Sequence, residues 1–228
     1  MTDLAAALAE LEKRADGSGE AGIARFGITT ADRVIGMSMK DVQAVAKAIG
    51  KDHELAQALW DAGVYEARML ACYVGDPKQV TPAEMDRWCD GFDNWATCNT
   101  ACFVLFDRTP HAFAKIDEWE RRNDEFGRRA AFALLASVAL HDKTAPDAAF
   151  VARLPLIEQA ASDDRNFVKK AVNWALRGIG NRKSPPLKAA ALDLAERLAG
   201  SKDKAARWVG KDAARQMRAR EAKAATRG

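Results

Sequence analysis

The chain has 228 residues, of which 48% are hydrophobic, 29% charged and 7% aromatic. Its length suffices to bury a substantial core, so one domain spanning residues 1–228 is expected, and the lack of a long uninterrupted apolar run excludes a membrane span. The net charge of +3 conceals an asymmetry, because residues 165–228 hold 17 Lys and Arg against 5 Asp and Glu, whereas residues 1–164 hold 18 against 27. A basic segment on an otherwise acidic chain indicates a polyanionic partner, nucleic acid above all, or a merely solvated basic tail.

The N-terminus and the cysteines indicate the compartment. No basic region followed by an apolar core opens the chain, so a signal peptide is not predicted. Four cysteines in a chain of this size do not suggest a disulfide scaffold. We therefore expect a cytoplasmic protein, and we expect it to be a monomer.

Helix-start and helix-stop residues divide the first half of the chain. Ser38 with Asp41 resembles a capping arrangement, and Gly50 is a stop. Thr81, Pro82 and Glu84 combine an N-cap, a first-turn proline and a capping-box acid. The predicted helices cover residues 3–15, 39–49, 52–62, 64–74 and 81–90, and a further helix capped by Asp93 runs through Phe106.

The second half continues in the same way. The predicted helices run from Pro110 to about residue 122, from the cap Asp124 through residue 140, over residues 146–161 with a bend at Pro155, from the cap Asp163 through residue 177, over residues 184–200, and from Ser201 onward. No segment alternates apolar and polar residues as a strand does. The predicted fold class is all-α.

A weak internal repeat suggests how these helices are arranged. Arg68, Arg129 and Lys170 each lie near the start of an apolar helix after an acidic residue, and the 41 positions from Arg129 to Lys170 fall within the roughly 40–47-residue period of helical-pair repeats. The 61 positions from Arg68 to Arg129 are irregular. Stacked helix pairs would form a HEAT-like solenoid whose second helices line a concave basic face and bind anions at their N-terminal ends. Without such stacking these residues are ordinary solvated charges.

Trp95 and Asn99 lie four positions apart on one predicted helix, so both side chains project from one face. A flat aromatic beside a short polar group suits contact with a ring or a cation, although a buried Trp with a hydrogen-bonded Asn is the more ordinary explanation of the pair taken alone. Together with Arg129 and Trp174, which we assign to neighbouring inner helices, they suit DNA that presents an exposed or cationic base.

Several motifs in this order resemble a known family. They are Phe26-Gly27-Ile28, Leu59-Trp60, Tyr65 to Ala71, Phe92-Asp93-Asn94-Trp95, Arg128-Arg129-Ala130 and Phe167 to Arg177. Over nearly its whole length the chain resembles the DNA alkylation repair family of HEAT-like-repeat DNA glycosylases.

The resemblance implies a partner and roles for individual residues. The partner is duplex DNA containing alkylated bases, with no metal or cofactor. Trp95 and Trp174 correspond to two tryptophans that pack against the lesion-bearing backbone, and Arg129 corresponds to a phosphate-contacting arginine, with Arg128 as the alternative register. We also place Lys169, Lys170 and Arg177 among the DNA-binding residues.

Asn99 stands where the resemblance places the catalytic aspartate. Family members with that aspartate excise cationic N3- or N7-alkylated purines without a deep base-flipping pocket. Such a base leaves as a neutral molecule, so the main demand is to stabilise the cationic sugar, which a carboxylate does and an amide does not. A unit charge at ~4 Å and an effective dielectric constant of ~20 is worth about 4 kcal/mol, or roughly a thousandfold in rate.

Three functions therefore remain open. The chain is a glycosylase for cationic alkylpurines, a DNA-binding relative in which Asn99 abolishes or weakens excision, or a HEAT-type protein–protein scaffold. The basic segment and the two tryptophans disfavour the scaffold. A zinc site is disfavoured because Cys98 and Cys102 lack the short paired spacing of structural sites, and no histidine is placed to activate either thiol.

Overall fold

The computed structural model describes residues 2–225. Within these residues the chain forms fourteen α-helices, one 3-10 helix and no β-strand, apart from an isolated parallel bridge between Arg33 and Val64. The all-α prediction is confirmed. The chain divides into two compact units, Met1–His111 and Ala112–Gly228, which we call unit 1 and unit 2. The single domain over residues 1–228 stays a prediction.

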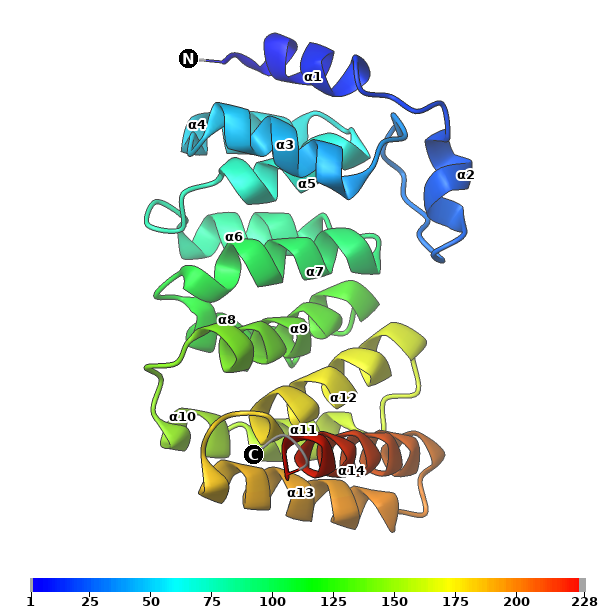
Figure 1. Cartoon of the computed structure of the whole chain (residues 1–228), viewed down its shortest axis with the longest axis vertical. Helices are drawn as coiled ribbons and strands as arrows, with labels where there is room; N and C mark the ends of the chain where they lie inside the picture. The colour runs from blue at the N-terminus through cyan, green and yellow to red at the C-terminus, as the bar shows by residue number, and fades with distance from the viewer. Residues whose placement is uncertain (1, 226–228) are drawn as a thin grey trace. The chain divides into compact units, whose positions relative to one another are not determined.

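Unit 1 is built around α5, which packs against α3, α4 and α7 (Figure 1). Its helices are α1 (Leu4–Glu12), α2 (Gly19–Ala24), α3 (Met39–Ile49), α4 (His53–Asp61), α5 (Tyr65–Val74), α6 (Pro82–Asp90) and α7 (Trp95–Val104), followed by the 3-10 helix η1 (Phe106–Arg108). The core includes Trp60 and Trp88, whose rings stack with centroids 4.1 Å apart. Such pairs add ~0.5–1.5 kcal/mol beyond the area they bury.

Unit 2 is built around α12, which packs against α9, α11, α13 and α14. Its helices are α8 (Ala112–Trp119), α9 (Glu125–His141), α10 (Asp147–Val151), α11 (Leu154–Ala160), α12 (Asn166–Gly180), α13 (Pro185–Ala199) and α14 (Lys204–Ala225). Small residues let α9 and α12 approach closely. A Cβ on Gly178 would lie 3.4 Å from Ala136 Cα, so α12 rests almost directly on the α9 backbone.

Most of the predicted helix starts are confirmed. Ser38, Asp124 and Ser184 each accept a hydrogen bond from a first-turn amide of α3, α9 and α13. Thr81 and Glu84 form the complete capping box at α6. Gly50 ends α3 with a φ of 80°, which is the left-handed conformation that favours glycine.

Two predicted caps are wrong. Asn94, not Asp93, caps α7 and accepts hydrogen bonds from the amides of Ala96 and Thr97. Asp163 does not cap α12, because its carboxylate pairs with Arg165 and Arg128 instead, and Arg165 occupies the cap position without a side-chain cap bond.

Two predicted boundaries also change, and one helix was not predicted. The single bent helix over residues 146–161 is two helices, because α10 ends at Val151 and Pro155 lies in the first turn of α11, where its missing N–H is tolerated. Residue Phe106 belongs to η1 rather than to the Trp95 helix. Finally, the short helix α2 begins at Gly19, and no helix was predicted there.

Candidate nucleic-acid interface

Trp95 is held in a fixed orientation in unit 1. It is the first residue of α7, directly after the cap Asn94, and it is partly exposed. Its indole N–H donates a hydrogen bond of 3.2 Å to the carbonyl of Phe26, in the segment that follows α2. Because one edge of the indole is tethered in this way, its orientation is set by a segment 69 residues away in sequence.

Two carboxylates, one partly exposed and one buried, hold the segment that supplies this carbonyl. Asp93 accepts hydrogen bonds of 2.8 Å from Thr30 Oγ1 and from the amide of Ala31. Glu66, which is 1% exposed, accepts the amides of Ile35 and Gly36 at 2.9 Å. These carboxylates replace the main-chain partners that the segment would have in a regular element.

An ion pair also holds the same segment. Arg68 Nε lies 2.9 Å from Asp32 Oδ2, and its Nη1 donates to the carbonyl of Gly91. Burial, opposed by the charge of Arg68, raises the pKa of Asp32. Arg68, which begins the predicted repeat, therefore joins α5 to the residues before α7 rather than facing a ligand.

Asn99 lies one helical turn after Trp95 on α7, and it is partly exposed. Asp93, the nearest carboxylate in sequence, is not available to replace a carboxylate at position 99, because it accepts hydrogen bonds from Thr30 and Ala31. The neighbouring thiols of Cys98 and Cys102 are buried. Burial, with Cys98 as a hydrogen-bond partner, raises the pKa of Cys102, which is the opposite of what activates a nucleophile.

In unit 2 the sequence-predicted arginines are already engaged within the protein. Arg129 is 5% exposed and donates a 2.6 Å hydrogen bond to the carbonyl of Phe167 at the start of α12. Arg128 is partly exposed and pairs with Asp163 at 3.1 Å. Both side chains tie the N-terminal end of α9 to that of α12.

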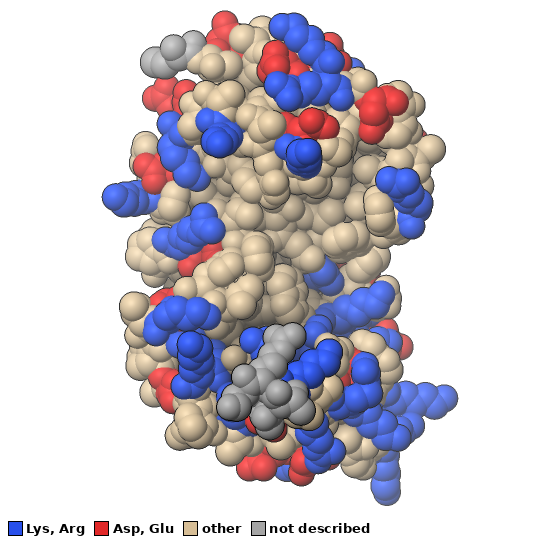
Figure 2. Space-filling model, viewed as in Figure 1, with Lys and Arg blue, Asp and Glu red and all other residues tan. Residues whose placement is uncertain are grey.

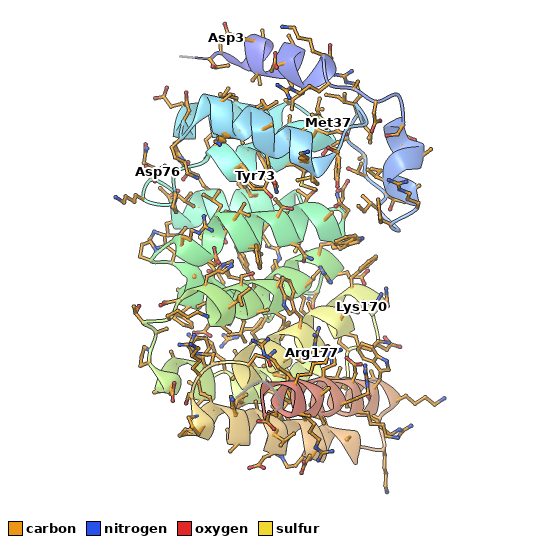
Figure 3. The ribbon with its side chains drawn as sticks, viewed as in Figure 1. Asp3, Met37, Tyr73, Asp76, Lys170 and Arg177 are labelled. Atoms are coloured by element: carbon orange, nitrogen blue, oxygen red, sulfur yellow. The ribbon has the colours of Figure 1, made fainter. Side chains whose placement is uncertain are left out.

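The remaining predicted residues lie on α12. Lys170 is exposed and Trp174 is partly exposed, and with Arg177 they follow the i, i+4, i+7 spacing of one helix face. Figure 3 shows Lys170 toward the N-terminal end of α12 and Arg177 where α12 passes α14. Lys169 instead lies over the ring of Trp208 on α14, with Nζ 5.3 Å from the ring centroid.

Arg177 is both a surface cation and a link between helices. Its Nε donates to Asn173 Oδ1 at 2.8 Å, and its Nη1 donates to Gln216 Oε1 at 2.7 Å. Burial lowers the pKa of Arg177, opposed by the carboxylate of Asp212. An arginine is nevertheless still a cation at neutral pH.

Beside this face lies a pocket of about 690 Å³, which we call the unit 2 pocket. Its wall includes Trp174, Arg177, Leu140, Lys143, Lys183 and Arg220. The sequence analysis did not identify it, because it forms where α9, α12 and α14 meet and no single segment carries its pattern.

The two units differ in charge. Unit 1 holds 11 Lys and Arg against 17 Asp and Glu, whereas unit 2 holds 24 against 15. Figure 2 shows Lys and Arg side chains gathered over α12, α13 and α14 on the face in view. Polyanion binding is therefore favoured on unit 2.

We also searched the described residues for metal sites and for membrane-spanning helices. Residues 2–225 contain no group of three or more His, Cys, Asp or Glu side chains placed to hold a metal ion. Among the same residues, no helical segment combines the length and hydrophobicity that crossing a membrane requires.

Comparison with known proteins agrees with this architecture. A family profile described as "DNA alkylation repair enzyme" matches residues 7–224. A solved structure described as belonging to a new family of proteins related to the HEAT-like repeat DNA glycosylases, with affinity for branched DNA structures, superimposes with a TM-score of 0.76 at 20% identity, over 94% of this chain and 95% of that one. The predicted HEAT-like helical-repeat fold is confirmed. No curated protein matches the chain.

Proposed function

We propose that this chain, which belongs to the DNA alkylation repair enzyme family, binds duplex DNA and recognises cationic N3- or N7-alkylated purines. The observation that carries the proposal is the start of α7. There Trp95 is oriented by its bond to the Phe26 carbonyl, and Asn99 follows one turn later on the same helix, both of them partly exposed. A fixed aromatic face attracts a cationic nucleotide in preference to a neutral one.

Affinity for DNA is assigned to unit 2. Its excess of cations neutralises phosphates and releases counterions, which makes binding strong at low salt and weak at high salt. Lys170 is exposed on α12 beside Trp174 and is the simplest phosphate contact among the residues predicted from the sequence. The family assignment favours DNA over a protein partner for this surface.

Excision is expected to be weak because of Asn99. The leaving base needs no strong acid, so the group that matters is the one that stabilises the positive sugar. An amide has the shape of a carboxylate without its charge. We therefore propose a DNA-binding family member whose rate of base release is limited at position 99.

A second candidate function is binding of branched DNA, the affinity by which the solved structure with this fold is described. The unit 2 pocket favours this function, because Trp174 in its wall can stack on an unpaired base, whereas a base that stays stacked in a duplex cannot enter the pocket.

The decisive experiment compares this chain with Asn99→Asp. Release of 7-methylguanine from methylated duplex is measured in single turnover with protein in excess, so that binding and chemistry are separated. We expect a gain on the order of a hundredfold or more in rate, with little change in affinity.

The matched control is Thr100→Asp, which adds the same charge to the neighbouring, partly exposed position. It should leave the rate unchanged. Equal rates for this chain and Asn99→Asp, with both variants folded and bound to DNA, would remove the catalytic role assigned to position 99.

A further inference from the structure

The unit 2 pocket exists because its floor is made of small residues. Ala136 and Ala139 on α9 face Gly178 on α12, and all three line the pocket. At these positions larger side chains would occupy the space that remains open. The volume of about 690 Å³ lies within the range of ~300–1,000 Å³ typical of small-molecule sites.

At the C-terminal end of α9, beside the pocket, two cations bind the backbone carbonyls that would otherwise repel an anion. The last carbonyls of a helix carry partial negative charge and would repel a phosphate. Arg182, which is 8% exposed, donates to the carbonyls of Ala139, Asp142 and Ala145 at 3.1, 2.6 and 3.1 Å. The ammonium group of Lys143 bonds a further carbonyl, that of Leu140. The helix end is thereby neutralised by two cations.

The wall of the pocket is strongly basic. Five of its lining residues are Lys or Arg and one is acidic, namely Asp147, which forms a hydrogen bond with Ser184. Lys183 and Arg220 are exposed at the wall, and they come from the α12–α13 connection and from α14. An excess of cations converging from separate elements selects an anionic ligand such as a phosphate.

The same pocket also offers an apolar surface. Trp174 is partly exposed, and Leu140 is 46% exposed although it is a large aliphatic residue. A ligand that covers both must carry a flat or apolar group close to its charge. A nucleotide has this combination, because its base stacks on aromatic side chains while its phosphate meets the cations.

We infer that the unit 2 pocket binds one unpaired nucleotide of a DNA strand, its base against Trp174 and Leu140 and its phosphate among Lys143, Lys183 and Arg220. The inference rests on the proposed DNA binding and adds the strand state to it. Paired bases are stacked in the helix and reach a pocket only after unstacking, which costs least where the strand is already single. The pocket therefore distinguishes DNA with an unpaired segment from continuous duplex.

The test compares the affinity of the chain for DNA with an unpaired segment with its affinity for continuous duplex DNA. Fluorescence anisotropy at one fixed salt concentration gives dissociation constants for a continuous duplex and for the same duplex bearing a short single-stranded flap. We expect the chain to prefer the flap substrate by about tenfold or more, from the stacking of one base together with the cation contacts that hold its phosphate in the pocket. In the double variant Lys183→Ala/Arg220→Ala this preference should fall to about twofold or less, while duplex binding weakens only modestly.

The matched control is the double variant Lys202→Ala/Lys204→Ala, which removes the same charge from exposed positions of unit 2 outside the pocket. It should weaken binding to both substrates alike and keep the preference. As an independent readout, 2-aminopurine placed in the flap should lose fluorescence on binding to the unaltered chain and not on binding to the pocket variant.

The outcomes separate the two proposals. If the chain binds duplex but shows no preference for the flap, or if the control loses the preference as the pocket variant does, the pocket inference is wrong and the proposed function stands. If the chain binds neither substrate at low salt, the proposed function fails as well.

Discussion

Replacing Arg129 with alanine should destabilise unit 2 more than it weakens DNA binding. The side chain is 5% exposed, its Nη1 lies 2.6 Å from the Phe167 carbonyl, and the guanidinium lies 5.9 Å from the centroid of the Phe167 ring. A hydrogen bond from a charged donor contributes ~1.5–3 kcal/mol, and a cation over an aromatic ring adds ~0.5–1 kcal/mol. We therefore expect the free energy of unfolding to fall by about 2–4 kcal/mol.

The measurement is urea unfolding followed by circular dichroism, together with the salt dependence of duplex binding. Arg121→Ala is the control, because the side chain of Arg121 is 80% exposed and its Nε pairs with the carboxylate of the adjacent Glu120 at 3.2 Å. It should change the free energy of unfolding by less than about 0.5 kcal/mol.

One result would refute the reasoning. Suppose that Arg129→Ala unfolds like the unaltered chain and that its logarithmic salt slope falls by about one phosphate contact. Arg129 would then contact DNA, as the family resemblance implies, and its bond to Phe167 would contribute little to stability. That phosphate-contacting role stays a prediction.

Two further predictions concern the helix starts. Asn94→Ala should lower the free energy of unfolding by about 1 kcal/mol, because the amides of Ala96 and Thr97 lose their acceptor, and Asn94→Asp should largely restore it; equal stability of all three would contradict the capping role. A hydrogen bond from Arg165, outweighing burial, lowers the pKa of Asp163, so the stability it contributes is present above the unfolded pKa of about 3.9 and is lost as pH falls through the folded value. Urea unfolding from about pH 5 to pH 2 should therefore show a smaller pH dependence for Asp163→Asn than for the unaltered chain, and identical slopes would exclude this linkage.

The sequence predicted those features whose causes lie within a few residues. The capping box of Thr81 and Glu84 is complete within four positions, so its chemistry can be recognised without knowing the fold. The cap of α7 was predicted wrongly because Asp93 and Asn94 are adjacent and equally suitable. The choice between them depends on Thr30 and Ala31, which bind Asp93 from more than 60 positions away.

In the candidate site, too, only the features with local causes could be predicted from the sequence. Trp95 and Asn99 were identified because their spacing is local, whereas the Phe26 carbonyl that orients the indole belongs to a distant segment. The buried state of Arg129 was also beyond prediction, since its position near a helix start is equally compatible with a phosphate and with the Phe167 carbonyl. The unit 2 pocket depends on residues from α9, α12 and α14, and only packing reveals which of their side chains converge.

The separation of charge between the units bears on how a carboxylate at position 99 would act. Unit 1 carries 17 acidic against 11 basic residues, so its net charge disfavours a polyanion, and the proposed affinity for DNA is assigned to the cations of unit 2. One more negative charge on α7 therefore changes affinity little. The added carboxylate acts on the positive charge that develops on the sugar as the glycosidic bond breaks. It therefore stabilises the transition state much more than the bound ground state. Under the function proposed above, the absence of a carboxylate at position 99 therefore lowers the rate of base release and leaves the occupancy of DNA unchanged.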